Sequence, residues 1–166
     1  MAGALIVTAE IGPSDFAWLD GLRRAHYPPE RNRVPAHLTI FHALPPSAER
    51  ELRGRISQAV GVPAPAATIA GIMDLGDGVA FRVVSPGLDH VREELAQELH
   101  GLLSAQDSGW RPHITIQNKV APKIARQLKV SLERSFRPRA LSITGLAIHR
   151  YLDGPWKQIA VYPFRA

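Results

Sequence analysis

Two short stretches of this sequence carry the same pattern of a histidine, an apolar residue, a threonine and an isoleucine. The first begins His37-x-Thr39 and the second His113-x-Thr115, each closely preceded by a proline. Imidazole exchanges protons near neutral pH, because its unperturbed pKa is about 6.5, and a hydroxyl can bind an anionic oxygen. Two such pairs around one small volume would suit acid–base chemistry at a phosphoryl group, with one imidazole taking a proton and the other giving one.

Alternation along a β-strand determines which side chains could share that volume. With strict alternation, the residues on the catalytic face are His37, Thr39, Phe41, His113, Thr115, Gln117 and Lys119. We therefore expect Phe41, Gln117 and Lys119 to contact substrate, with Phe41 as a platform on which a base could stack or as a filler between the lobes. The same parity places His42 on the core side.

An internal repeat relates the two stretches. The two histidines are separated by 113 − 37 = 76 residues, and sliding the sequence along itself by 76 aligns apolar segments without a gap. Residues 5–8 then match 81–84, residues 67–73 match 143–149, and Asp77-Gly78 matches Asp153-Gly154. Such self-similarity indicates a duplication. We expect one bilobal domain over 1–166, made of two pseudo-symmetric repeats at about 1–77 and 78–153 and a C-terminal strand at 155–164.

Each repeat has the pattern of a β-α-β-α-β unit. Opening strands are predicted at 4–10 and 79–84, followed by helices, the first of which starts near an N-cap at Ser14 and stops before Pro28. Ser47 is expected to cap the next helix, and Pro122 to occupy the first turn of its counterpart. Asp-Gly pairs indicate hairpin turns. The prediction is an α+β fold with mainly antiparallel sheets around a central cleft and helices outside, in which hairpins can exchange strands between the lobes.

Composition limits the remaining possibilities. The chain has 166 residues, 45% hydrophobic content and no cysteine, which excludes disulfides and thiolate metal sites. Its net charge of +5 weakly favours polyanionic partners. No signal peptide and no apolar run of about 20 residues is visible, so a cytoplasmic protein without a membrane span is expected. No spacing suggests a metal site, and no cofactor is expected.

The paired motifs and duplicated halves resemble the two-histidine (2H) phosphoesterases, which include 2′-5′ RNA ligase-like proteins and cyclic phosphodiesterases. The resemblance implies a bilobal fold and metal-independent action on 2′,3′-cyclic phosphates or 2′-5′ linkages of RNA or nucleotides. It implies that His37 and His113 are the acid–base pair, and that Thr39 and Thr115 bind the phosphate. By the same resemblance, the second histidine, His113, is the base and the first, His37, is the acid.

Two departures from the family pattern bear on substrate. The first motif is followed by "FHALP", where members of the family often have Phe-Leu-Gly, and Asn118 stands where many members have arginine. Arg33, in the proline-rich loop before the first motif, could bind phosphate or simply be solvated. Trp110, Tyr151 and Trp156 could stack on a base, but such aromatics are more typical of the core.

The sequence therefore predicts an enzyme that hydrolyses 2′,3′-cyclic phosphates on nucleotides or RNA ends. The alternatives are a 2′-5′ RNA ligase or 2′-5′ phosphodiesterase, which would use the same residues, and a non-catalytic RNA- or nucleotide-binding module. Hydrolase and ligase share their chemistry, so sequence does not separate them. The expected partner is RNA or a nucleotide, and the expected state is a monomer.

Overall fold

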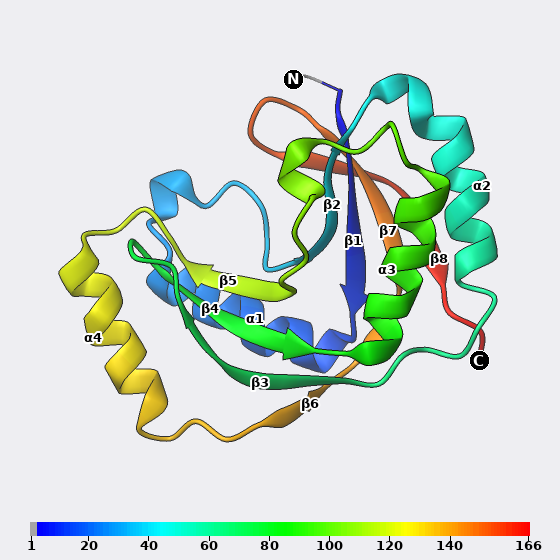
Figure 1. Cartoon of the computed structure of the whole chain (residues 1–166). Coiled ribbons are helices and arrows are strands. Elements are labelled where there is room, and N and C mark those ends of the chain that lie inside the picture. Colours follow the sequence, from blue (N-terminus) through cyan, green and yellow to red (C-terminus); the bar gives the residue numbers. More distant parts are fainter. Residues whose placement is uncertain (1–2) are drawn as a thin grey trace.

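The computed structural model describes residues 3–166 and contains two four-stranded antiparallel sheets, one in each lobe (Figure 1). The first sheet has the order β2-β1-β7-β8, with bounds Leu38–Leu44, Leu5–Ile11, Ile143–Tyr151 and Trp156–Pro163. The second has the order β5-β4-β3-β6, with bounds His113–Gln117, Val79–Val84, Ala67–Asp74 and Arg139–Leu141. The predicted α+β class with antiparallel sheets is confirmed.

Two of the helices pack on the lobe opposite to the one that contains the strand before them. Helix α1 (Pro13–His26) follows β1 but packs against β5 of the second sheet, where α4 (Pro122–Glu133) also contacts β3 and β4. Helices α2 (Glu49–Ala59) and α3 (Pro86–Glu98) pack against each other and lie on the lobe of the first sheet (Figure 1). Each half of the chain thus contributes elements to both lobes. In particular, β3 of the first half lies in the second sheet and β7 of the second half lies in the first, in line with the expected exchange of hairpin strands.

The core explains why the strands lie where they do. Residues Ala4–Ala9 are all buried, as expected for an apolar strand covered on both faces. In the two histidine strands, the alternating residues Leu38, Ile40, Ile114 and Ile116 are at most 1% exposed. These apolar pairs anchor β2 and β5 in the core, so the histidine and threonine of each strand face away from it.

Local signals were right for the end of α1, which stops at His26 before Pro28, and for the start of α4, and they were wrong for the starts of α1 and α2. The Ser85 hydroxyl caps α3 by accepting from the Leu88 amide at 3.2 Å, and α4 begins at Pro122 as predicted. Helix α1 begins at Pro13 without a side-chain cap, so Ser14 lies inside its first turn. Ser47 belongs to a 3₁₀ turn, η2 (Pro46–Ala48), which precedes α2.

The uniform offset of 76 residues is wrong for the start of each repeat. Strand pairing joins Ala9 to Leu38 and Phe81 to Ile114, so the opening strands are related by 81 − 9 = 72 residues, while the histidine strands keep 76. A gap therefore falls between the opening strand and the first motif. The duplication itself stays a prediction, which the corresponding places of β1 and β4 and of β2 and β5 in the two sheets support. Residues 1 and 2 of the first predicted repeat lie outside the described residues.

Both predicted Asp-Gly turns are confirmed as hairpins. The β3–β4 turn contains Asp77-Gly78, and the β7–β8 turn contains Asp153-Gly154. Asp153 and Gly154 have positive φ angles of 58° and 137°, which fits the preference of Asp and Gly for left-handed turn positions. Within residues 3–166, no helix is long and apolar enough to cross a membrane.

Candidate active site

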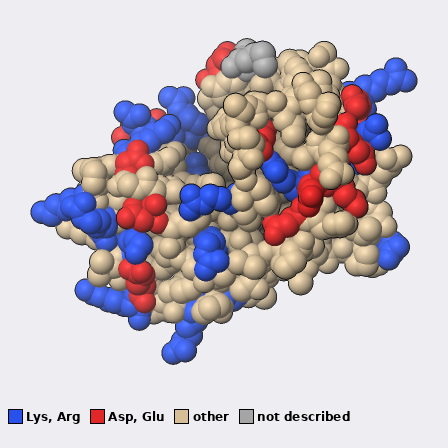
Figure 2. All heavy atoms as spheres, viewed as in Figure 1, with Lys and Arg blue, Asp and Glu red and all other residues tan. Residues whose placement is uncertain are grey.

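The four residues of the paired motifs line one cavity between the lobes. His37, Thr39, His113 and Thr115 all contribute to it, and its volume is about 440 Å³, a size typical of small-molecule sites. Figure 2 shows the surface hollowed between the lobes, with lysine and arginine side chains gathered on the lobe that carries α4. Residues that are 76 positions apart in the sequence thus meet at a single site.

The two imidazoles are held in the same way. His37 Nδ1 lies 2.8 Å from the carbonyl oxygen of Pro35, and His113 Nδ1 lies 2.7 Å from that of Arg111. A carbonyl oxygen can only accept, so each Nδ1 carries the hydrogen and each neutral ring has its lone pair at Nε2. Both residues therefore keep Nε2 free for proton transfer, and the bond to the residue two positions upstream fixes each ring.

A buried arginine from α1 ties the two motifs together. Arg23 is 3% exposed and donates to the Thr115 carbonyl and to the Asn32 side chain, both at 2.9 Å. Its guanidinium also lies 4.2 Å from the centre of the Tyr27 ring. Arg23 thus fixes β5 relative to the loop that leads into β2.

A neighbouring carboxylate fixes the same loop. Asp20, also in α1, accepts from the Ala36 amide at 2.9 Å, immediately before His37. Sequence reasoning missed Arg23 and Asp20 because only the packing of α1 on the opposite lobe brings them to the motifs.

Burial governs the protonation of His37. Desolvation lowers the pKa of His37 to about 4, and the nearby charges of Arg23, His149 and His113 act in the same direction, while the hydrogen bond to Pro35 opposes them. His37 is therefore neutral at pH 7 in the free protein and able to accept a proton.

Two β-bulges overturn the strict alternation used for the substrate residues. The partner of β1 moves from Phe41 to Thr39 between Val7 and Thr8, so two residues of β2 oppose one of β1. Phe41 turns into the core, where it is 0% exposed, and does not line the cavity. The predicted orientation of Phe41 is therefore wrong.

The second bulge changes β5 in the same way. Gln117 pairs with Val79 while Thr115 pairs with Ala80, which leaves Ile116 as the extra residue. Gln117 is 3% exposed and lies outside the cavity, and its side-chain oxygen has no hydrogen-bond partner within residues 3–166. The expectation that Gln117 faces the catalytic side is wrong for the same reason as for Phe41.

His42 and Lys119 also differ from expectation. His42 lines the cavity, because the bulge reverses its side, and the core-facing prediction is wrong. Lys119 is exposed, has a φ of 61° and lies outside the lining of the cavity, because β5 ends at Gln117 and alternation no longer applies. Arg33 lines an adjoining cavity, and its contact with phosphate stays a prediction.

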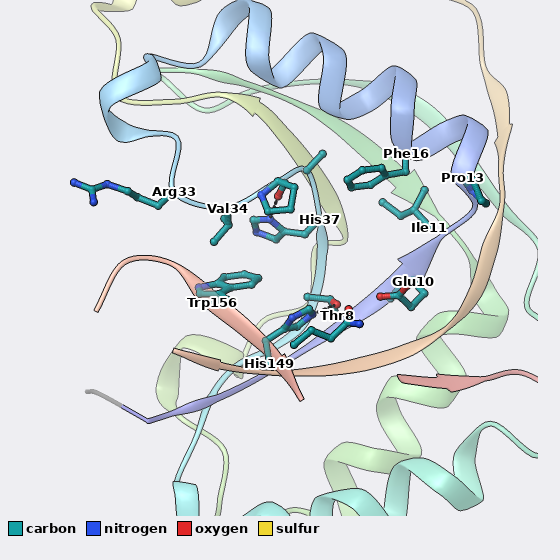
Figure 3. A pocket seen from close by; sticks show the side chains of 14 residues that line it. Thr8, Glu10, Ile11, Pro13, Phe16, Arg33, Val34, His37, His149 and Trp156 are labelled. Carbon is teal, nitrogen blue, oxygen red and sulfur yellow. Dashed lines mark hydrogen bonds between the residues drawn. The ribbon is translucent and has the colours of Figure 1, made fainter. Parts of the chain in front are cut away.

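That adjoining cavity, of about 490 Å³, shares His37 and Trp156 with the first (Figure 3). The Trp156 ring lies between two imidazoles, with its centre 4.6 Å from that of His37 and 5.4 Å from that of His149. Phe16 and Ile11 add apolar surface on the opposite side. Trp156 is half-buried and lines both cavities, so it does not have the core location that is typical of such aromatics.

His149 is a second cavity residue that sequence reasoning missed. Its Nε2 lies 2.8 Å from the hydroxyl of Thr8, and burial lowers its pKa. No pattern in the sequence distinguishes it, since β7 reaches the site only through pairing with β1. Among residues 3–166, no group of three or more His, Cys, Asp or Glu side chains could hold a metal ion.

The fold and the paired histidines define a two-histidine phosphoesterase type of protein. The family model of the 2′-5′ RNA ligase superfamily matches residues 11–155, and the chain belongs to this superfamily. The resemblance inferred from the motifs is therefore confirmed. No curated protein matches the chain.

Solved structures with the same fold cover nearly the whole chain. The protein TT0787 of Thermus thermophilus has a TM-score of 0.69 at 16% identity, with 98% of both chains covered. E. coli LigT complexed with NADP⁺ has a TM-score of 0.59 at 15% identity, with 99% of both chains covered. E. coli LigT complexed with 3′-AMP has a TM-score of 0.55 at 16% identity, with 100% of both chains covered. These similarities show that the chain has the same fold as these proteins.

Proposed function

We propose that this protein is a metal-independent phosphodiesterase that hydrolyses 2′,3′-cyclic phosphates on nucleotides or RNA ends. The observation that carries the proposal is the matched pair of imidazoles, His37 and His113, which line one cavity with their Nδ1 atoms bonded to backbone carbonyls. An acid–base reaction at phosphorus needs two such proton carriers on either side of one phosphate.

The reaction proceeds by displacement at phosphorus. Water attacks the phosphorus while one imidazole takes the water proton at Nε2. The bond from phosphorus to the 2′ or 3′ oxygen breaks, and the other imidazole donates its Nε2 proton to that oxygen, which leaves a phosphomonoester and a hydroxyl. The hydroxyls of Thr39 and Thr115 donate to the non-bridging oxygens, on which negative charge builds.

The roles of the two histidines are assigned by protonation. Because the pKa of His37 is about 4, His37 is neutral at pH 7 and fits the base. His113 then acts as the acid. This order is the reverse of that implied by the family resemblance, and it rests on the desolvation that lowers the pKa of His37.

The adjoining cavity suits the base of the nucleotide. Trp156 and Phe16 offer aromatic faces beside His37, and stacking on such faces accepts any base. The crystal structures of E. coli LigT with 3′-AMP and with ATP concern nucleotides bound to that protein, and they support a nucleotide as the ligand here.

The proposal is tested by screening the wild-type protein against 2′,3′-cyclic nucleotides and 2′-5′ dinucleotides in excess chelator. Turnover of the cyclic nucleotides is expected with and without chelator. Turnover of 2′-5′ dinucleotides alone would identify the alternative 2′-5′ phosphodiesterase, and tight binding without turnover of any substrate would identify a binding module.

A further inference from the structure

The cavity has a cationic end beyond the paired motifs. Besides the motif residues, His42, Arg92, Arg111, Trp110 and Asp107 line it. Within the described residues that line the cavity, Asp107 is the single acidic one, and its carboxylate is held by His42. Arg92 and Arg111 thus line a cavity whose single carboxylate, that of Asp107, is already hydrogen-bonded to His42.

His42 is positioned by this carboxylate. Asp107, in η3 (Ala105–Asp107), is 3% exposed and accepts from the His42 amide at 3.0 and 3.1 Å and from His42 Nδ1 at 2.8 Å. Since a carboxylate only accepts, Nδ1 carries the hydrogen. The His42 side chain is 39% exposed, so its Nε2 edge is left open toward the cavity.

Arg92 is fixed beside this pair. Its guanidinium lies 5.0 Å from the Trp110 ring centre and 5.2 Å from that of Phe41, and it donates to the Asp107 carbonyl at 2.5 Å. Its Nε is buried without a hydrogen-bond partner within residues 3–166. A positive charge held between aromatic rings in a low-dielectric site attracts an anion more strongly than a solvated one.

We infer that His42, oriented by Asp107, binds a second phosphate of the substrate, next to the phosphate that reacts between His37 and His113. This inference rests on the proposed function. His42 stands three residues after Thr39 on β2 and lines the same cavity. The bulge between them keeps the spacing below about 10 Å along the strand, which two phosphates on one nucleotide can span. A phosphate oxygen only accepts, so Nε2 must carry a hydrogen to bind it, and the ring then bridges the Asp107 carboxylate and the phosphate.

The consequence is a preference for RNA ends over simple cyclic nucleosides. With the base beside Trp156 and the cyclic phosphate at the paired motifs, the 5′-phosphate of the same nucleotide lies toward His42. That phosphate is either a terminal monoester or the diester link to the preceding nucleotide, and both offer the same anionic oxygens to His42 and Arg92.

The test compares kcat/KM for three substrates with the same base: a nucleoside 2′,3′-cyclic phosphate, its 5′-phosphorylated form and a dinucleotide with a 2′,3′-cyclic end. The wild-type protein should favour at least one phosphate-bearing substrate by about tenfold, the size of one charge-assisted hydrogen bond. His42→Ala should lower that ratio to near one, and His100→Ala, at an exposed site, should keep it. The favoured substrate distinguishes monoester from diester.

A wild-type ratio near one for both phosphate-bearing substrates, or an unchanged ratio in His42→Ala, would overturn the inference. A binding measurement separates this result from failure of the proposed function. Wild type should bind a nucleoside 3′,5′-bisphosphate about tenfold more tightly than the 3′-monophosphate, and His42→Ala should lose the difference even if no cyclic substrate is turned over. Equal affinities in wild type would overturn the inference independently of activity.

Discussion

At the scale of single residues, the site depends on how two imidazoles are oriented and protonated. His37 and His113 each bond through Nδ1 to a carbonyl two residues upstream, which leaves the same nitrogen of each ring available. They differ in environment, since burial lowers the pKa of His37 to about 4. Two chemically identical groups can therefore take different roles.

The pH dependence of kcat/KM tests these roles. Because kcat/KM reports the free enzyme and His37 must be neutral to act as base, the acid limb should fall below pH 6, toward the His37 pKa of about 4. The measurement is kcat/KM for a cyclic nucleotide from about pH 3.5 to 9, with circular dichroism as a control for folding. An acid limb that stays near neutral pH would contradict the assignment of His37 as the base.

The same pKa predicts how stability depends on pH. The pKa of His37 is about 4 in the folded protein and about 6.5 in the unfolded chain, so protonation favours unfolding. The stability that neutral His37 contributes is full above pH 6.5 and is lost as pH falls to about 4, at up to about 1.4 kcal/mol per pH unit. Chemical denaturation at several pH values should show a steeper loss for wild type than for His37→Gln. Parallel curves would contradict the pKa.

At the scale of elements, the site is assembled where the chain passes between lobes. Strand β6 lies in the second sheet and β7 in the first, with Ser142 between them. Gly12, at the end of β1, donates to the Ser142 carbonyl at 2.9 Å. A Cβ atom at Gly12 would lie 2.6 Å from Ser142 Oγ and 2.8 Å from Ser142 Cβ.

Gly12→Ala should therefore destabilise the protein by about 1–3 kcal/mol, the usual cost of overpacking. The matched control is Gly54→Ala in α2, where a Cβ atom meets nothing within 4 Å. That change should stabilise the helix by about 0.5–1 kcal/mol. Chemical denaturation measures both variants, and equal stabilities would show that the approach of Gly12 to Ser142 carries no constraint.

Strand alternation shows how far the sequence could predict the site. It placed the two histidines and two threonines on one face, because Leu38, Ile40, Ile114 and Ile116 must be buried. It failed after Ile40 and Ile116, where bulges turn Phe41 and Gln117 into the core. A bulge depends on the register against β1 and β4, which are distant in sequence, so no local pattern revealed it.

At the scale of the whole molecule, the two lobes bring together segments from both halves of the chain. The first motif on β2 and Trp156 on β8 belong to the first sheet, the second motif on β5 belongs to the second, and all three contribute to adjoining cavities. The fold class could be predicted from the order of strand and helix patterns along the chain. The residues that support the motifs, such as Arg23 and His149, could not, because their role arises only from packing between lobes.

The cooperation of the two histidines across the lobes is the central claim, and it is tested most directly by kcat for a 2′,3′-cyclic nucleotide in wild type, His37→Ala, His113→Ala and the double variant, with His100→Ala as control. Each single change should lower kcat by about 10²–10⁴. The double change should cost much less than the product of the two, since groups that act as one unit are not additive. A single variant with near wild-type kcat, or losses that multiply fully, would contradict a paired acid–base mechanism.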